Sequence, residues 1–203
     1  MPDDMKTFLY QTFDAKTADS IIKNYSAMLN EMHSEQEELL SPSQFKLAKT
    51  RILIRIALYR SIKNHTKGED ALAHTKKYFY AKVKAASKLV KFAGKSELGC
   101  TLFRKAFSYG LRADTWISAI KKNDKESLVF DITKCLYKDL CDFYKCPELC
   151  MMFCDGDWLA FGDMEKLKFE RKYTLGYGDE LCDFKFTKQS RYNMREYYRN
   201  SRT

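Results

Sequence analysis

The feature that most constrains the fold is a change in hydrophobic periodicity near Asn123. Before this position, apolar residues recur every three or four positions, which is the spacing of one face of an α-helix. After it, short segments alternate between apolar and polar residues, as half-buried strands do. Because helices come first and alternating segments come later, the sequence predicts an α+β fold.

Helices are predicted throughout the first part of the chain. Ser41 followed by Pro42 supplies an N-cap and a first-turn proline for one of them. That helix carries apolar residues on two faces, which predicts a central position with neighbours on more than one side. The predicted helices of this N-terminal bundle span residues 17–33, 41–65, 69–92 and 96–109.

Strands are predicted in the second part of the chain. The segment SLVFDIT alternates and is rich in branched residues, which predicts a strand at 127–133. Pro147 suits the first turn of a helix extending to Phe161. The alternating segments at 166–175 and 181–187 flank a glycine-containing turn and predict a β-hairpin. The sequence therefore predicts a small antiparallel sheet with a C-terminal helix and a β-hairpin.

The length of 203 residues is enough for one hydrophobic core, so we predict a single domain over 1–203. Within it we distinguish a mainly helical half (1–122), an α+β half that carries the motif described below (123–188) and a basic tail (189–203). An uncharged apolar segment of the roughly 20 residues that span a bilayer is absent from the sequence. We therefore expect a soluble, cytoplasmic protein without a membrane partner.

The net charge of +9 raises the question of a nucleic-acid partner. The positive excess lies mainly in residues 67–95, which hold eight lysines and two acids, whereas residues 147–187 are acidic. A basic helical face is usually a solvated face, and this one lacks the interleaved aromatic residues of a single-strand groove. We therefore predict no nucleic-acid partner.

Candidate site residues lie on the helix predicted after Pro147. Cys150, Cys154, Asp157 and Phe161 follow one another at intervals of four, three and four, which puts them on one stripe. An acid in an otherwise apolar helix is rarely buried without a partner. The sequence therefore predicts that Cys154 and Asp157 point the same way, toward a partner of opposite charge.

The predicted hairpin supplies that partner. Arg171 is the charged member of the apolar face of its strand, and its planar guanidinium suits a carboxylate of the protein or of a ligand. On the second strand, Cys182 shares a face with two phenylalanines. The inward face of the first strand is predicted to hold Leu167, Phe169, Arg171, Tyr173 and Leu175, with Lys168, Glu170, Lys172 and Thr174 outward.

Other interpretations of these residues stay open. Cysteine often packs as a small hydrophobic residue, so Cys154 and Cys182 could simply fill the core. Asp157 and Arg171 could form a structural ion pair instead of a ligand clamp. Cys146, Cys150 and Cys154 repeat every fourth residue, but structural zinc sites usually use shorter gaps on loops. We therefore predict no metal and no cofactor, with zinc as a minor alternative.

The segment from Cys135 to Phe186 resembles the C-terminal half of the L-2-amino-thiazoline-4-carboxylic acid hydrolase family. The resemblance covers about 55 of the 203 residues. The chain departs from the pattern in its additional cysteines at 141, 146 and 150 and in its basic central helix. The matching residues are Cys135 after a strand, Cys154 and Asp157 as C-x-x-D, Arg171 and Thr174 in FERKYTL, and Gly178, Asp179, Cys182, Asp183 and Phe184 in GYGDELCDF.

The resemblance implies a hydrolase that opens a cyclic isothiourea, such as 2-amino-thiazoline-4-carboxylate, to a carbamoyl-cysteine. It assigns catalysis to Cys154, Asp157 and Cys182, with either a thiolate or water activated by a carboxylate as the nucleophile. The alternative is a non-catalytic small-ligand-binding module of the vinyl-reductase type. The expected partner is a small-molecule substrate, and a homodimer is left open. The residues expected to bind the substrate are Arg171, Thr174, Cys135 and Asp183.

Overall fold

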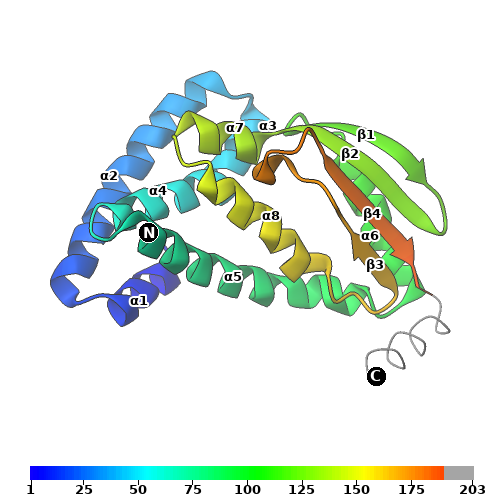
Figure 1. The fold of residues 1–203 in the computed structure, drawn as a ribbon, viewed down its shortest axis with the longest axis horizontal. Coiled ribbons are helices and arrows are strands. Elements are labelled where there is room, and N and C mark those ends of the chain that lie inside the picture. Colours follow the sequence, from blue (N-terminus) through cyan, green and yellow to red (C-terminus); the bar gives the residue numbers. More distant parts are fainter. Residues whose placement is uncertain (190–203) are drawn as a thin grey trace. The chain divides into compact units, whose positions relative to one another are not determined.

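The computed structural model describes residues 1–189, which form helices and one antiparallel sheet (Figure 1). The predicted α+β fold is therefore confirmed. The helices are α1 (Asp3–Thr12), α2 (Ala15–Leu39), α3 (Pro42–Leu47), α4 (Leu53–Lys63), α5 (Gly68–Ala93), α6 (Glu97–Gly110), α7 (Leu136–Phe143) and α8 (Glu148–Phe161). The strands are β1 (Trp116–Asn123), β2 (Ser127–Cys135), β3 (Leu167–Glu170) and β4 (Cys182–Lys188).

The predicted helices of the first part are present. Ser41 caps α3 in a capping box with Gln44, as the Ser-Pro pair indicated. The predicted helix at 41–65 is interrupted by a π-helical segment at Ala48–Ile52, between α3 and α4. Helix α4 is central to its part of the molecule, because the side chains on several of its faces are buried. These buried residues are Leu53, Ile56, Ala57, Leu58, Tyr59 and Ile62.

The chain divides into two compact units that do not follow the predicted halves. Unit 1 comprises Met1–Lys82 and Leu136–Met152, and unit 2 comprises Val83–Cys135 and the described residues from Phe153 to 189. The end of α5 and all of α6 therefore belong with the sheet. The single-domain organisation stays a prediction, and each unit is described by itself below.

Unit 2 is built on the sheet, whose strand order is β1-β2-β4-β3 with antiparallel neighbours. Strand β1 was not predicted. Five of its eight residues in succession, from Ala119 on, are solvent-exposed, so this edge strand carries no alternating apolar face. Asp124 forms the turn into β2, because its carboxylate accepts the backbone N–H groups of Glu126 and Ser127 at 2.9 and 2.8 Å.

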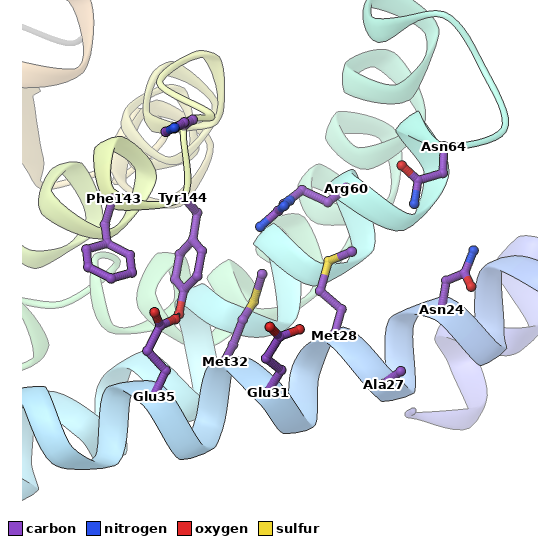
Figure 2. A pocket seen from close by; sticks show the side chains of 11 residues that line it. Asn24, Ala27, Met28, Glu31, Met32, Glu35, Arg60, Asn64, Phe143 and Tyr144 are labelled. Carbon is purple, nitrogen blue, oxygen red and sulfur yellow. The ribbon is translucent and has the colours of Figure 1, made fainter.

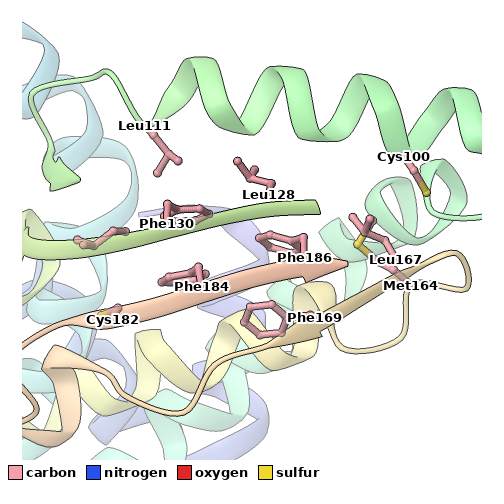
Figure 3. Close-up of a cluster of buried hydrophobic side chains, with 11 residues drawn as sticks. Cys100, Leu111, Leu128, Phe130, Met164, Leu167, Phe169, Cys182, Phe184 and Phe186 are labelled. Atoms are coloured by element: carbon pink, nitrogen blue, oxygen red, sulfur yellow. The ribbon is translucent and has the colours of Figure 1, made fainter. Parts of the chain in front are cut away.

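One face of the sheet is covered by aromatic side chains (Figure 3). Phe130 lies opposite Phe184 in the register of β2 and β4, and their rings stack with centroids 5.0 Å apart. From α6, Phe103 and Phe107 contact this layer, and Phe161 of α8 packs on Phe169 of β3. This aromatic core fixes where α6 and the second part of α8 lie against the strands.

The predicted hairpin is only partly confirmed. Strand β4 places Cys182, Phe184 and Phe186 on the buried face as predicted. Strand β3, however, ends at Glu170, and the next residues are not in the ladder. Thr174 is consequently buried while Tyr173 is 43% exposed, the reverse of the predicted faces.

Two carboxylates explain this reversal. The carboxylate of Asp183 accepts the backbone N–H groups of Lys172 and Tyr173, at 2.9 and 2.5 Å. The carboxylate of Asp179 accepts the N–H of Thr174 at 2.7 Å. Side chains therefore replace the partners that a strand would have supplied, and the alternation of faces is lost. A 3-10 turn at Leu175–Tyr177 and Gly178, with φ of 93°, return the chain toward β4.

Within residues 1–189, none of the helices combines the length and the apolar composition needed to cross a membrane. The predicted basic tail begins at 189, and its residues 190–203 lie outside the described part of the chain.

Candidate functional site

The two predicted catalytic cysteines both lie within hydrogen-bonding distance of one hydroxyl group. The Oγ1 atom of Thr174 lies 3.0 Å from Sγ of Cys154 and 3.3 Å from Sγ of Cys182. Cys154 comes from α8, Cys182 is the first residue of β4, and Thr174 lies in the loop between β3 and β4. Residues that are far apart in the sequence therefore share one cluster in unit 2.

The local structure holds each member of this cluster in place. Cys182 lies opposite Ile132 in the β2–β4 register, and its Sγ accepts the backbone N–H of Leu175 at 3.3 Å. Thr174 is fixed through its backbone by Asp179. Both Cys182 and Thr174 are buried, whereas Cys154 is half-buried. Of the two thiols, Cys154 is therefore the more accessible to a ligand.

Burial determines which group of the cluster is protonated. Burial raises the pKa of the Cys182 thiol above its usual range, although the hydrogen bonds of Thr174 and Leu175 act in the opposite direction. Cys182 is therefore protonated at neutral pH. Because a hydroxyl has one hydrogen, Thr174 can accept from the Cys182 thiol while it donates to Sγ of Cys154. The three groups then form one directed hydrogen-bond chain that ends at Cys154.

Arg171 and Asp157 form an ion pair beside this chain. Nη1 of Arg171 donates to Oδ2 of Asp157 at 2.6 Å, and its Nη2 donates to the carbonyl oxygen of Cys154 at 3.0 Å. The guanidinium also lies 5.4 Å from the centre of the Phe184 ring. The Arg171 side chain is 4% exposed and that of Asp157 32% exposed. The predicted partners are thus in contact, and the buried charge of Arg171 is balanced from within the protein.

A second acid of α8 is also held by the β3–β4 loop. The hydroxyl of Tyr177 donates to Oδ1 of Asp155 at 2.8 Å, and this hydrogen bond raises the pKa of Tyr177. The two carboxylates nearest Cys154 in the sequence therefore each accept a hydrogen bond from the segment after β3. Sequence reasoning did not identify Tyr177, although its place in the GYGDE turn was visible.

Two residues that the resemblance assigned to substrate binding do not contact the Thr174 hydroxyl, although Asp183 lines the groove described below. Asp183 follows Cys182 directly, so it belongs to the opposite face of β4, where it holds the loop backbone. Cys135 lies at the end of β2 opposite Trp116, partly buried against the aromatic core. The hydroxyl of Thr174 bonds neither of them. Asp183 thus positions the loop that carries Thr174.

Unit 2 contains a groove of about 510 Å³ that is not lined by Cys154, Thr174 or Cys182. Arg171 connects this groove to the cluster, because it lines the groove and also bonds Asp157 and the Cys154 carbonyl. Four basic side chains, two acidic ones and two aromatic rings line the groove. Lys168 and Lys185 pair with Glu170, and Arg171 pairs with Asp157, so Lys172 is the lining cation best placed to meet an anionic small molecule. Its lining residues are Trp158, Lys168, Phe169, Glu170, Arg171, Lys172, Asp183 and Lys185.

Unit 1 contains a groove of about 530 Å³ between α2, α4 and the end of α7 (Figure 2). Arg60, Glu31 and the ring of Phe143 are among its lining side chains. No thiol and no predicted site residue lines it. The candidate site therefore lies in unit 2.

The remaining cysteines of α7 and α8 are also grouped. Cys141, Cys146 and Cys150 are buried in unit 1, and hydrogen bonds from Cys146 and Cys150 together with burial raise the pKa of the Cys141 thiol. All seven cysteines of the chain are thiols rather than halves of disulfides. Over residues 1–189, no three side chains of His, Cys, Asp or Glu are arranged to hold a metal ion.

Comparison with known proteins gives one match. Residues 46–186 match the family model described as L-2-amino-thiazoline-4-carboxylic acid hydrolase, which covers well over half of the chain. The matched region includes every predicted site residue. No curated protein and no solved structure matches the chain.

Proposed function

This chain belongs to the L-2-amino-thiazoline-4-carboxylic acid hydrolase family, and we propose that it is a hydrolase that opens a cyclic isothiourea such as 2-amino-thiazoline-4-carboxylate to a carbamoyl-cysteine. One observation carries the proposal. A buried hydroxyl, that of Thr174, bridges the thiols of Cys154 and Cys182 beside the Arg171–Asp157 ion pair. This arrangement supplies a nucleophile, a hydrogen-bond donor to that nucleophile and a charged pair within one unit.

Cys154 is the proposed nucleophile. It is the more exposed thiol, and its sulfur accepts the hydrogen bond of Thr174, which stabilises a thiolate. In the first step Sγ of Cys154 bonds to the amidine carbon, and the ring carbon–sulfur bond breaks as the ring sulfur takes a proton from solvent water. In the second step water adds to the same carbon, the Cys154 thiolate leaves, and two protons pass to solvent, one of which replaces the proton taken in the first step. The product then carries a urea carbonyl, and one water has been consumed.

Thr174 and Cys182 are proposed to stabilise the Cys154 thiolate through their chain of hydrogen bonds. When the Cys154 thiolate is expelled, the Thr174 hydroxyl donates a hydrogen bond to that sulfur and accepts one from the Cys182 thiol, so the leaving thiolate is stabilised while Cys182 keeps its proton. Because burial keeps Cys182 protonated, it is suited to this role and poorly suited to attack. The roles of the two cysteines thus differ because of their environments.

The proposed position of the substrate carboxylate is the basic groove. Arg171 already donates to Asp157 and to the Cys154 carbonyl, so we assign it to positioning α8 against the loop. Lys172, which lines the groove next to Arg171, is the proposed partner of the carboxylate. Asp157 remains a candidate for orienting the protonated amidine or for activating water.

The burial of Cys182 and Thr174 favours one alternative function. In that alternative the thiols pack and the groove binds an anionic ligand without reaction. Turnover by the purified full chain separates the two, with carbamoyl-cysteine measured by mass spectrometry. The variants are Cys154→Ser, Cys182→Ser and Asp157→Asn.

The matched control is Cys100→Ser. Cys100 is buried in the aromatic core of the same unit and donates to the Gly94 carbonyl at 3.7 Å, a bond that a serine hydroxyl can also make. We expect loss of product in Cys154→Ser and retention in Cys100→Ser. Loss in Asp157→Asn with retention in Cys154→Ser would favour activated water. A folded protein that yields no product in any form would support the binding module.

A further inference from the structure

Helix α6 carries apolar side chains on two opposite faces. Its inner face contributes Cys100, Phe103 and Phe107 to the aromatic core, and Figure 3 shows Cys100 directed from α6 toward the strands. Its outer face carries Leu98, Leu102 and Tyr109, which are 69%, 57% and 76% exposed. The intervals of four and seven residues put these three on one stripe. A helix that already buries one face in a core does not need a second apolar face for folding.

The end of α5 extends this exposed surface. Leu89 and Phe92 are both more than two thirds exposed, and they precede α6 by only a short turn. The first turn of α6 packs directly on that end, because a Cβ atom at Gly99 would lie 2.1 Å from the carbonyl oxygen of Ala93. We call the five exposed residues the outer patch. It consists of Leu89, Phe92, Leu98, Leu102 and Tyr109.

Basic residues surround the outer patch. Residues 83–112 contain seven basic residues and a single acid, Glu97, which pairs with Lys188 at 3.0 Å. Lys105 falls on the same helical stripe as the three apolar residues of α6, and Arg112 follows directly after the end of that helix. Five exposed basic residues of this segment have no ion-pair partner among the residues the structure describes. They are Lys84, Lys88, Lys95, Lys105 and Arg112.

We propose that the outer patch and its basic rim bind the surface of a membrane that contains anionic lipids. Apolar side chains at the level of the headgroups and lysines among lipid phosphates are the combination that interfacial helices use. The core of a protein interface is depleted in lysine, and exposed leucines contribute nothing to binding nucleic-acid phosphates. The proposal departs from the sequence prediction of no membrane partner, and it concerns binding to the surface of a bilayer without crossing it.

Vesicle co-sedimentation of the full chain tests this proposal. The probes are phosphatidylcholine vesicles with and without phosphatidylserine, at low and high salt. We expect binding to the phosphatidylserine vesicles, weakened by salt because the basic contacts are screened. Leu98→Gln combined with Leu102→Gln should lower the partition coefficient at least about tenfold, since two apolar side chains no longer enter the interface. Lys105→Glu and Arg112→Glu should each lower it about fivefold or more.

The controls use equally exposed residues of unit 1. Leu39→Gln replaces a leucine that is 62% exposed, and Lys16→Glu reverses an exposed charge. Both should leave binding unchanged, and none of these surface changes should alter the circular dichroism spectrum. Absence of binding to phosphatidylserine vesicles, or equal loss in the controls, overturns the proposal. So does a dimer in light scattering that the double leucine variant dissociates, because the patch would then be covered by a second copy of the chain.

Discussion

Breaking the Arg171–Asp157 pair should destabilise unit 2 by several kilocalories per mole. The guanidinium is 4% exposed and makes two hydrogen bonds, at 2.6 Å to Asp157 and at 3.0 Å to the Cys154 carbonyl. Hydrogen bonds of a charged group contribute about 1.5–3 kcal/mol each, and Asp157 can be partly solvated when its partner is removed. For Arg171→Met, which keeps most of the aliphatic stem, we therefore expect a loss of about 3 kcal/mol in the free energy of unfolding.

Asp157→Asn should cost more, about 3–5 kcal/mol, because it leaves the buried guanidinium without a counter-charge. The double variant should lose less than the sum of the two single losses, since neither charge then remains buried alone. Urea unfolding followed by tryptophan fluorescence is a suitable assay, because both tryptophans, Trp116 and Trp158, belong to unit 2. This expectation would be refuted if each single variant lost less than about 1 kcal/mol in the free energy of unfolding and the double variant lost the sum of the two, because solvent-exposed ion pairs behave in that way.

Three other outcomes follow from the structure. Iodoacetamide should modify Cys154 before Cys182, whose pKa is raised by burial; peptide mapping by mass spectrometry measures the order, and equal rates would contradict it. Thr174→Val should lower kcat on the thiazoline substrate about 100-fold while Thr174→Ser keeps most of it, and equal activities would exclude a role of the Thr174 hydroxyl in stabilising the thiolate. The backbone N–H groups of the β1–β2 turn are the chief cause that lowers the pKa of Asp124 from 3.8 to about 2. The ionised Asp124 should therefore stabilise the fold above pH 3.8, and this contribution should be lost as the pH falls toward 2. The stability difference between the parent and Asp124→Ala should therefore shrink over this range, and a constant difference would refute the assignment.

The elements that could be predicted from the sequence are those whose pattern is local. Ser41 and Pro42 mark a helix start because a cap bonds residues within the same turn. The alternation of Cys182, Phe184 and Phe186 is visible because the strand buries one face. The partnership of Asp157 with Arg171 was expected because a charged residue on each of two apolar faces requires a partner.

The elements that escaped prediction depend on contacts between distant parts of the chain. Strand β1 is an exposed edge, so its pairing with β2 leaves no apolar pattern in the sequence. Thr174 turns inward because Asp179 and Asp183 bond the backbone of the loop and end the strand early, and no periodicity encodes those bonds.

The candidate site could also be predicted only in part, because its residues come from distant parts of the chain. The sequence by itself determined which residue types are available, namely two thiols, a carboxylate and a guanidinium on apolar faces of predicted elements. Only the tertiary structure decided that Cys154 and Cys182 share the hydroxyl of Thr174, whereas Asp183 faces the other side of the sheet. The direction of a side chain within one helix or strand follows from the regular repeat of that element. Which elements come into contact depends on how their apolar surfaces pack, which is a property of the whole unit.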